Sequence, residues 1–340
     1  MSLPRRLSSS APYNPALEGT HLALRAPGAS FQAFDAERLF VQGWPWIRRA
    51  AERAQGRLGV AVIAFDGEDR VIGEHWVAAS VDKTRSSVVG RHPSCSVPVP
   101  ASFKEIPLRH LLLLVRAKNN EEVEVRAIDL HTSLGFGDES GRALQSAMLG
   151  GTAFLSIGAL RLAIVETSSL DLGDAPEVAY RAVPGRVFAD EEPGPYLAGP
   201  RLVRAHDVDG LTIVRSRLGP LAAAGPLLED EEPIRGRLTL GSRGLAVTRD
   251  VGSAALKRGI LVGRYSRCDV STQQDSETLS RVHALLLEDR GQIVLVDTAS
   301  SNGIWVDNRE VRVLRLDPEG EAWLGRPGEG LGLIWTDALQ

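Results

Sequence analysis

The pattern of apolar and polar positions changes several times along the chain. Residues 1–32 are rich in Ser, Pro, Gly and Ala without sustained periodicity, which predicts a mobile tail. Pro45 is followed by WIRRAAERA, and because proline is tolerated in a first helical turn we expect a short helix within residues 33–56. We therefore assign residues 1–56 to a tail that carries a short helix.

The pattern from residue 57 to residue 166 is that of β-strands. Short β-branched or alternating runs such as RLGVAVIAF and EVEVRAI are separated by turn signals such as DGED and KNNEE. The β pattern returns over residues 236–340 with runs such as HALLLE, QIVLVD and GLGLIW. Strand-rich stretches of this length with regular turns predict a sandwich, so we expect an all-β protein with two β-sandwiches in tandem.

Residues 167–235 differ from both stretches. DEEPGPY and EDEEP are acidic and rich in Pro or Gly, as is typical of segments that connect domains. Within this segment, alternating runs on either side of Val208-Asp209-Gly210 indicate a local hairpin over 201–217. We predict a Pro/Gly-rich connector that carries one hairpin.

The two β-rich stretches repeat one pattern. GRHPSC begins at Gly90 and GRYSRC begins at Gly263, and each places a cysteine five positions after its glycine. The glycines, the cysteines and the histidines of HLLLLV and HALLLE are each 173 residues apart (263 − 90). Asp129 and Asp297 are only 168 apart, so the first copy carries five extra residues (173 − 168), which we place in RAKNNEEVEV. A duplicated β-domain is the simplest explanation.

Composition narrows the function classes. The 340 residues fit roughly two domains, and a net charge of −4 argues against a broad nucleic-acid-binding face. Arginine-rich, Ala/Gly-rich usage fits a GC-rich bacterial genome. Two cysteines make no disulfide framework, so we expect a reducing compartment and two small buried side chains.

No membrane segment or secretion signal is expected. The N-terminal arginines lack an apolar region behind them, and the longest aliphatic run, LLLLV, is far shorter than the ~20 residues that span a bilayer. We predict a cytoplasmic protein.

Three turns of the second copy carry the candidate chemistry. They contain Arg264, Ser280-Arg281 and Ser301-Asn302, and each lies beside an apolar run, where loops at the end of a sandwich often bind ligands. A guanidinium with neutral donors and no Asp/Glu pair suits a phosphate monoester. A carboxamide donates and accepts at once, so Asn302 can hold a peptide main chain.

These motifs resemble a known family. GRYSRCD, SRVHA and DTASSNGIWV are similar, in the same order, to the signature of forkhead-associated (FHA) domains, which are phosphothreonine-binding β-sandwiches. The resemblance implies that Arg264 and Ser280 contact the phosphate, that Ser301 supports that site, and that Asn302 holds the peptide backbone. Arg281 would contact the phosphate or the peptide. The resemblance also implies architectural roles for Gly263, His283, Asp297 and Gly303.

The first copy also resembles an FHA domain but departs where binding is concentrated. Arg91 is present, whereas Pro107 replaces the serine and thereby removes both a hydroxyl and an N–H. Leu134 replaces the asparagine, although Ser133 and Gly135 remain. Hydrogen bonds to charged groups are worth about 1.5–3 kcal/mol each, so losing two would weaken phosphopeptide binding roughly 100-fold or more. We interpret this copy as a degenerate module for packing, dimerisation or a phosphate-independent partner.

The sequence thus predicts a non-catalytic adaptor in Ser/Thr kinase signalling. Its partner would be a phosphothreonine protein, either a substrate of such a kinase or the autophosphorylated kinase itself. The alternative is a phosphate-independent scaffold in which both sandwiches only mediate assembly. An enzyme with a site in 167–235 is a third hypothesis, but HExxH, CxxC and GxSxG motifs are absent. The scattered histidines predict no metal, and no cofactor is expected. The sequence leaves the partner, the kinase, the flanking specificity and the choice between monomer and homodimer open.

Overall fold

The computed structural model describes most of the chain. The residues that it leaves undescribed are 1–19, 25–30, 131, 133, 169, 184–186, 191–226, 230, 243–244, 266–267, 272–277, 319 and 339–340. Ser133 and the predicted hairpin over 201–217 therefore lie outside the described residues, as do most of residues 1–32. The described part of that tail includes a strand, Thr20–Leu24.

In the part of the chain that the structure describes, the first sandwich has thirteen strands in two sheets. They are β1 (Thr20–Leu24), β2 (Gly59–Phe65), β3 (Val71–Ala78), β4 (Arg85–Gly90), β5 (Val97–Pro98), β6 (Leu111–Ala117), β7 (Val123–Asp129), β8 (Phe136–Asp138), β9 (Ala143–Leu144), β10 (Ser146–Gly150), β11 (Ala153–Ile157), β12 (Leu160–Glu166) and β13 (Val187–Asp190). One sheet has the order β13-β1-β10-β7-β6-β4-β5 and the other has the order β3-β2-β12-β11-β8-β9.

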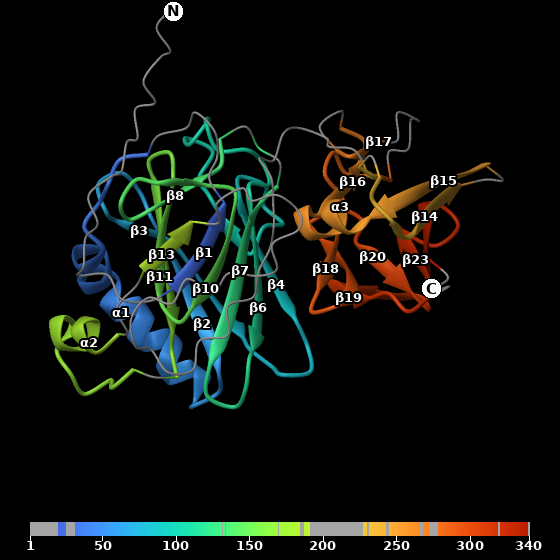
Figure 1. Cartoon of the computed structure of the whole chain (residues 1–340). Helices are drawn as coiled ribbons and strands as arrows, with labels where there is room; N and C mark the ends of the chain where they lie inside the picture. The colour runs from blue at the N-terminus through green and yellow to red at the C-terminus, as the bar shows by residue number, and fades with distance from the viewer. Residues whose placement is uncertain are drawn as a thin grey trace, which may run out of the picture.

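The second sandwich lies beside the first (Figure 1). Its elements are β14 (Ile234–Ser242), β15 (Leu245–Gly252), α3 (Ser253–Arg258), β16 (Ile260–Gly263), β17 (Val270–Ser271), β18 (Ala284–Asp289), β19 (Gln292–Asp297), β20 (Ile304–Val306), β21 (Arg309–Val311), β22 (Val313–Arg315), β23 (Glu321–Leu324) and β24 (Leu331–Asp337). Its sheets have the orders β15-β14-β24-β23-β20-β21 and β17-β16-β18-β19-β22.

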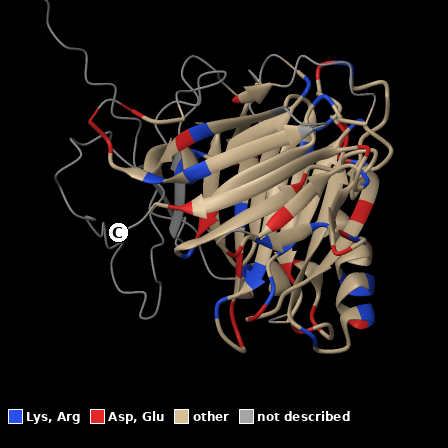
Figure 2. Cartoon of the chain, turned by 90° about the vertical axis from the view of Figure 1, so that its right-hand side faces the viewer, with Lys and Arg blue, Asp and Glu red and all other residues tan. Residues whose placement is uncertain are grey.

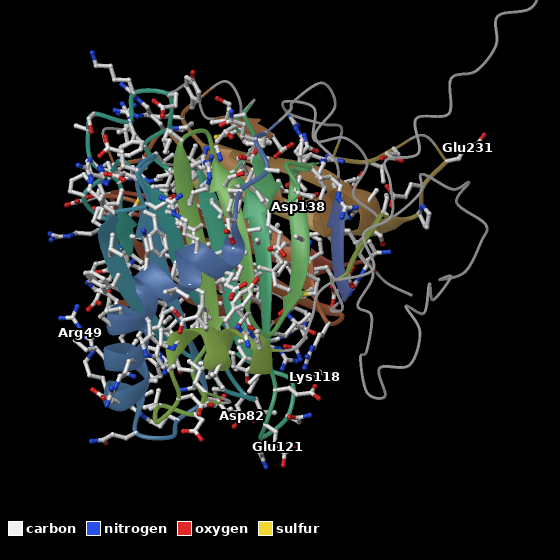
Figure 3. All side chains as sticks on the ribbon, turned by 90° about the vertical axis from the view of Figure 1, so that its left-hand side faces the viewer. Arg49, Asp82, Lys118, Glu121, Asp138 and Glu231 are labelled. Atoms are coloured by element: carbon white, nitrogen blue, oxygen red, sulfur yellow. The ribbon has the colours of Figure 1, made fainter. Side chains whose placement is uncertain are left out.

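The strand orders confirm the duplication. The order β3-β2-β12-β11-β8-β9 corresponds strand for strand to β15-β14-β24-β23-β20-β21, and β10-β7-β6-β4-β5 corresponds to β22-β19-β18-β16-β17. The turn between β6 and β7 is longer than the turn between β18 and β19, as expected from the offset. Figure 3 shows Lys118 and Glu121 of this turn at one end of the first sandwich, near Asp82. The predicted class, two β-sandwiches in tandem, is confirmed.

Two helices cover the first sandwich on the side away from the second (Figure 1): α1 (Ala36–Ala54) and α2 (Pro176–Ala182). Asp35 caps α1 by accepting a hydrogen bond from the Arg38 amide at 3.1 Å. The predicted helix is therefore present, but Pro45 lies inside it rather than in its first turn. An interior proline costs about 3 kcal/mol, and the buried side chains of Phe40 and Ile47, which pack on the sheet, offset that cost.

The two sandwiches are joined by a third apolar core. In β6, Leu111 and Leu113 point into the first sandwich, whereas Leu112 and Leu114 point toward the second. Leu285 of β18 packs in the same intervening core. Strands that are covered on both faces read as continuous apolar runs, and this accounts for LLLLV and HALLL. The sheet that contains β4, β6 and β7 thus packs face to face on the sheet that contains β16, β18 and β19.

A buried ionic cluster fixes the register of this interface. Arg116 donates to both carboxylate oxygens of Asp289 at 2.6 Å and to Glu124 at 2.7 Å. Arg116 and Asp289 are themselves 173 residues apart and so occupy equivalent positions in the two copies. Equivalent positions of the two copies therefore face each other at this interface. Among the described residues, no helix has the length and apolar character needed to cross a membrane.

Candidate functional site

Gly263 ends β16 where the chain passes very close to the next turn. The Arg264 amide donates to the Ser280 carbonyl at 3.2 Å, and the Tyr265 amide donates to the Arg281 carbonyl at 3.0 Å. A Cβ at residue 263 would lie 2.4 Å from the Arg281 carbonyl oxygen, which no side chain tolerates. Glycine is therefore required here, and it brings the first two of the three turns together.

His283 connects the second turn to the third. Its Nδ1 accepts a hydrogen bond from the Ser280 amide at 3.1 Å, and its Nε2 lies 2.9 Å from the Gly303 carbonyl. With Nδ1 as an acceptor, the ring is neutral and Nε2 is the donor. Burial lowers the pKa of His283, more than the Gly303 carbonyl and Asp297 raise it. This histidine braces two turns.

The third turn is tied directly to Ser280. The Ser301 amide donates to the Ser280 hydroxyl at 2.9 Å. Asn302 donates from Nδ2 to the Thr278 carbonyl at 2.8 Å, so its carboxamide is held over the second turn. Gly303 follows with a φ of 69°, which is the left-handed conformation that favours glycine.

Asp297 and Ser300 shape the third turn from inside. The Ser300 amide donates to Asp297 Oδ1 at 3.0 Å, and the Gly303 amide donates to the Ser300 hydroxyl at 2.9 Å. Sequence reasoning did not single out Ser300, although serine hydroxyls often bond to backbone two or three residues along a turn. The two consecutive serines of SSNG were the feature of the sequence that could have indicated this role.

The site separates buried supports from exposed side chains. His283 and Asp297 are buried, and Ser280 is only 8% exposed. Four residues around them are exposed: Arg264, Arg281, Ser301 and Asn302. The structure thus brings together all the sequence-predicted site residues of the second copy. The exposed surface thus carries two arginines, one hydroxyl and one carboxamide, and the nearly buried Ser280 hydroxyl lies next to it through its bond to the Ser301 amide.

The first sandwich keeps corresponding hydrogen bonds between its turns but has different side chains at the binding positions. The Arg91 amide donates to the Pro107 carbonyl at 3.2 Å, and His110 Nε2 bonds the Gly135 carbonyl at 2.7 Å. Proline has no N–H, so residue 107 cannot make the bond that Ser280 makes to its histidine. Leu134 packs against the apolar core, and Arg91 donates from Nε to the Ile106 carbonyl. The hydroxyl and carboxamide of the second site are both missing here.

Acid is expected to weaken the fold through His283. Because burial lowers its pKa in the folded state, the unfolded chain takes up a proton first when the pH falls below about 6.5. Stability is therefore fully present above that pH and declines below it by up to about 1.4 kcal/mol per pH unit for each such group. The pKa values of His75 and His92 are lowered in the same direction, again mainly by burial.

Urea unfolding measured across this range checks the expectation. The midpoint should fall from neutral to mildly acid pH, and a His283→Gln variant should show a shallower dependence. An unchanged midpoint in the parent chain would contradict the buried neutral histidine.

One comparison with known proteins matches part of the second sandwich. Residues 260–319, which contain every site residue named above for the second copy, match the family model described as the FHA domain. The second sandwich therefore contains an FHA domain. No curated protein matches the chain at a significant level.

Solved structures, two of them described as FHA domains, are also similar to part of the chain. The crystal structure of Mycobacterium tuberculosis Rv1747 FHA-1 is 28% identical, with 30% of this chain and 98% of that chain covered and a TM-score of 0.25. The FHA domain of CT664 protein from Chlamydia trachomatis is 21% identical over 30% of this chain and 99% of its own, with a TM-score of 0.24. Mycobacterium tuberculosis EmbR in complex with a low affinity phosphopeptide is 19% identical over 31% of this chain and 25% of its own, with a TM-score of 0.24.

Proposed function

We propose that the second sandwich binds a phosphothreonine-containing segment of a partner protein. One observation carries the proposal: hydrogen bonds from Ser301 to Ser280 and from His283 to Gly303 lock the turns together. The exposed side chains of these turns therefore gather on one surface before any ligand arrives. A preorganised surface is the arrangement that binds a small charged group most effectively.

The chemistry of the surface suits a phosphate monoester. Such a group carries about −1.5 to −2 charge at pH 7 and offers three acceptor oxygens. Arg264 can donate two parallel bonds to it. The Ser280 hydroxyl accepts from the Ser301 amide, so its own proton is available for a phosphate oxygen.

Asn302 and Arg281 would bind the peptide around the phosphate. Asn302 uses one Nδ2 hydrogen for the Thr278 carbonyl, and its carboxamide can also meet the backbone of an extended peptide. Arg281 is exposed and directly follows Ser280 in the chain. Gly263, His283, Asp297 and Gly303 would act only by shaping the turns.

The cellular role that fits this site is that of a non-catalytic adaptor in Ser/Thr kinase signalling. Phosphothreonine is a kinase product, so the partner would be a kinase substrate or an autophosphorylated kinase. Figure 2 shows acidic and basic residues interspersed on the side that it presents, which does not resemble the basic face of a nucleic-acid-binding protein. The first sandwich, with one sheet buried against the second, would serve as a support.

A phosphothreonine peptide library tests the proposal on the full chain. We expect enrichment of phosphorylated over unphosphorylated members. Ser280→Ala should weaken the selected peptide by about tenfold, since a hydrogen bond to a charged group is worth about 1.5–3 kcal/mol. Ser102→Ala, an exposed serine of the first sandwich, is the matched control and should have no effect. A library without phosphate-dependent enrichment would refute the proposal.

A further inference from the structure

The third turn of the second site contains a residue in a strained backbone conformation. Ala299 has a φ of 61°, in the left-handed region that residues with a Cβ rarely adopt. It is only 1% exposed, and its side chain packs in the core between the two sandwiches. Ser300, Ser301 and Asn302 follow it directly, so its conformation sets the direction in which these residues leave the core. The shape of the turn therefore depends on the contacts that hold Ala299.

An arginine of the first sandwich contacts the backbone at this point. Arg109 is 5% exposed and donates from Nε and Nη2 to the Ala299 carbonyl, at 2.9 and 2.6 Å. The N–H of the same peptide unit, which belongs to Ser300, donates to Asp297 Oδ1 at 3.0 Å. A peptide unit is planar and rigid. Its orientation is therefore fixed at both ends, by one residue from each sandwich.

The rest of the turn is held on either side of this peptide unit. Before it, the Thr298 hydroxyl donates to the Val282 carbonyl at 3.1 Å. After it, the Ser301 amide donates to the Ser280 hydroxyl at 2.9 Å. Rotation of the Ala299–Ser300 unit would break its bonds to Arg109 and would displace the residues that follow. Arg109 thus acts on the exposed part of the turn without being exposed itself.

The two copies differ at the position that makes this contact. Arg109 and Val282 occupy equivalent positions, because they are 173 residues apart (282 − 109), as the glycines and histidines of the repeat are. Val282 is buried in the core between the sandwiches, and a valine side chain has no hydrogen-bond donor. The second copy therefore cannot return the contact. The copy that lacks the serine hydroxyl and the carboxamide is the one that supplies the arginine.

We propose that Arg109 is a positioning residue of the phosphothreonine site, supplied by the other sandwich. It holds the Ala299–Ser300 peptide unit in the orientation that presents Ser301 and Asn302 to the peptide. The inference rests on the proposed function and gives the first sandwich a defined part in it. The unit that binds phosphopeptide is then the pair of sandwiches rather than the second sandwich alone.

Removing the donors of Arg109 tests the inference on the full chain. Arg109→Met keeps a long side chain but deprives the Ala299 carbonyl of both bonds. We expect the library-selected phosphothreonine peptide to bind about tenfold more weakly, the effect of losing one hydrogen bond to a charged group. Arg109→Lys retains a charged donor and should recover part of that loss. Calorimetric titration measures the affinities.

Arg126→Met is the matched control. Arg126 is 6% exposed, also belongs to the first sandwich, and donates to the Lys257 and Glu288 carbonyls of the second, at 2.6 and 3.3 Å. Glu288 lies near the far end of β18, five residues (288 − 283) beyond His283, or roughly 17 Å along an extended strand. Both substitutions should lower the melting temperature, but Arg126→Met should leave peptide affinity unchanged. A role limited to joining the sandwiches would make the two variants alike.

Hydrogen exchange without ligand gives a second readout, which does not depend on attraction between Arg109 and a phosphate. The Ser300, Ser301 and Gly303 amides are all hydrogen-bonded within the site. Loosening of the turn should make these amides exchange about tenfold faster in Arg109→Met than in Arg126→Met. Residue-resolved exchange by NMR measures the rates.

The outcomes separate the inference from the proposed function. If the parent chain binds phosphothreonine peptides and Arg109→Met binds them equally well, the inference is wrong and the proposed function stands. Equal exchange rates in the two methionine variants would also remove Arg109 as a positioning residue. If Arg109→Met does not fold, Arg109→Lys takes its place and must bind more weakly than the parent. If the parent binds no phosphothreonine peptide, the proposed function is wrong and the inference falls with it.

Discussion

Arg264→Ala is expected to reduce phosphothreonine-peptide affinity by roughly 100-fold or more. The substitution removes a guanidinium that can donate two charge-assisted bonds to the phosphate, and two such bonds at about 1.5–3 kcal/mol each amount to at least that factor. The fold should be unaffected, because Arg264 is exposed and supports the frame through its backbone amide, which alanine retains. Calorimetric titration with the library-selected peptide measures the effect.

Arg309→Ala is the matched control for this prediction. Arg309 is also exposed and belongs to the second sandwich, but it lies in β21, outside the three turns. Its removal should leave both peptide affinity and melting temperature unchanged. Equal affinities for the parent and Arg264→Ala would remove Arg264 from the phosphate site.

Arg116→Ala should destabilise the chain by about 3–5 kcal/mol, because breaking a buried ion pair leaves its partners as uncompensated charges. The Arg116 side chain is 7% exposed, and its partners Asp289 and Glu124 are 11% and 8% exposed. Both carboxylates would lose their principal cation at the interface between the sandwiches. Denaturant unfolding followed by fluorescence gives the change in the free energy of unfolding.

An exposed ion pair provides the comparison. Arg315 and Asp317 lie 3.9 Å apart with side chains 63% and 81% exposed. Arg315→Ala should therefore cost no more than about 1 kcal/mol, as is usual for surface pairs. If Arg116→Ala were equally mild, the ionic cluster would contribute little to holding the sandwiches together.

Much of the fold could be predicted from local sequence. The constant spacing of Gly90 and Gly263 from their histidines reflects two superimposable frames, because a glycine is needed where β4 and β16 pass within van der Waals contact of the next turn. The shorter spacing of the two aspartates placed extra residues of the first copy after Arg116, and the turn between β6 and β7 is indeed longer than the turn between β18 and β19. Insertions are tolerated in an exposed hairpin of this kind. Ser300 was missed because its role is internal to the turn.

The arrangement of the two copies could not be predicted in this way. LLLLV was interpreted only as an aliphatic run too short to span a bilayer, and nothing local showed that the HALLL strand of the other copy would cover its second face. Pro45 was predicted to lie in the first helical turn because the rule considers only the local preference of proline. The structure places it inside α1, where burial of Phe40 and Ile47 on the sheet offsets its cost. Arg109 was overlooked for a related reason: its partner, the Ala299 carbonyl, lies 190 residues away.

The central claim is that the three locked turns of the second sandwich bind a phosphate ester on threonine. Its most direct test is calorimetric titration of the full chain with one peptide in two forms, phosphorylated and unphosphorylated on the same threonine. Loss of the phosphate should weaken binding by roughly 100-fold or more, since the charge-assisted bonds from Arg264 and Ser280 disappear together. Equal affinity for the two forms would contradict the claim.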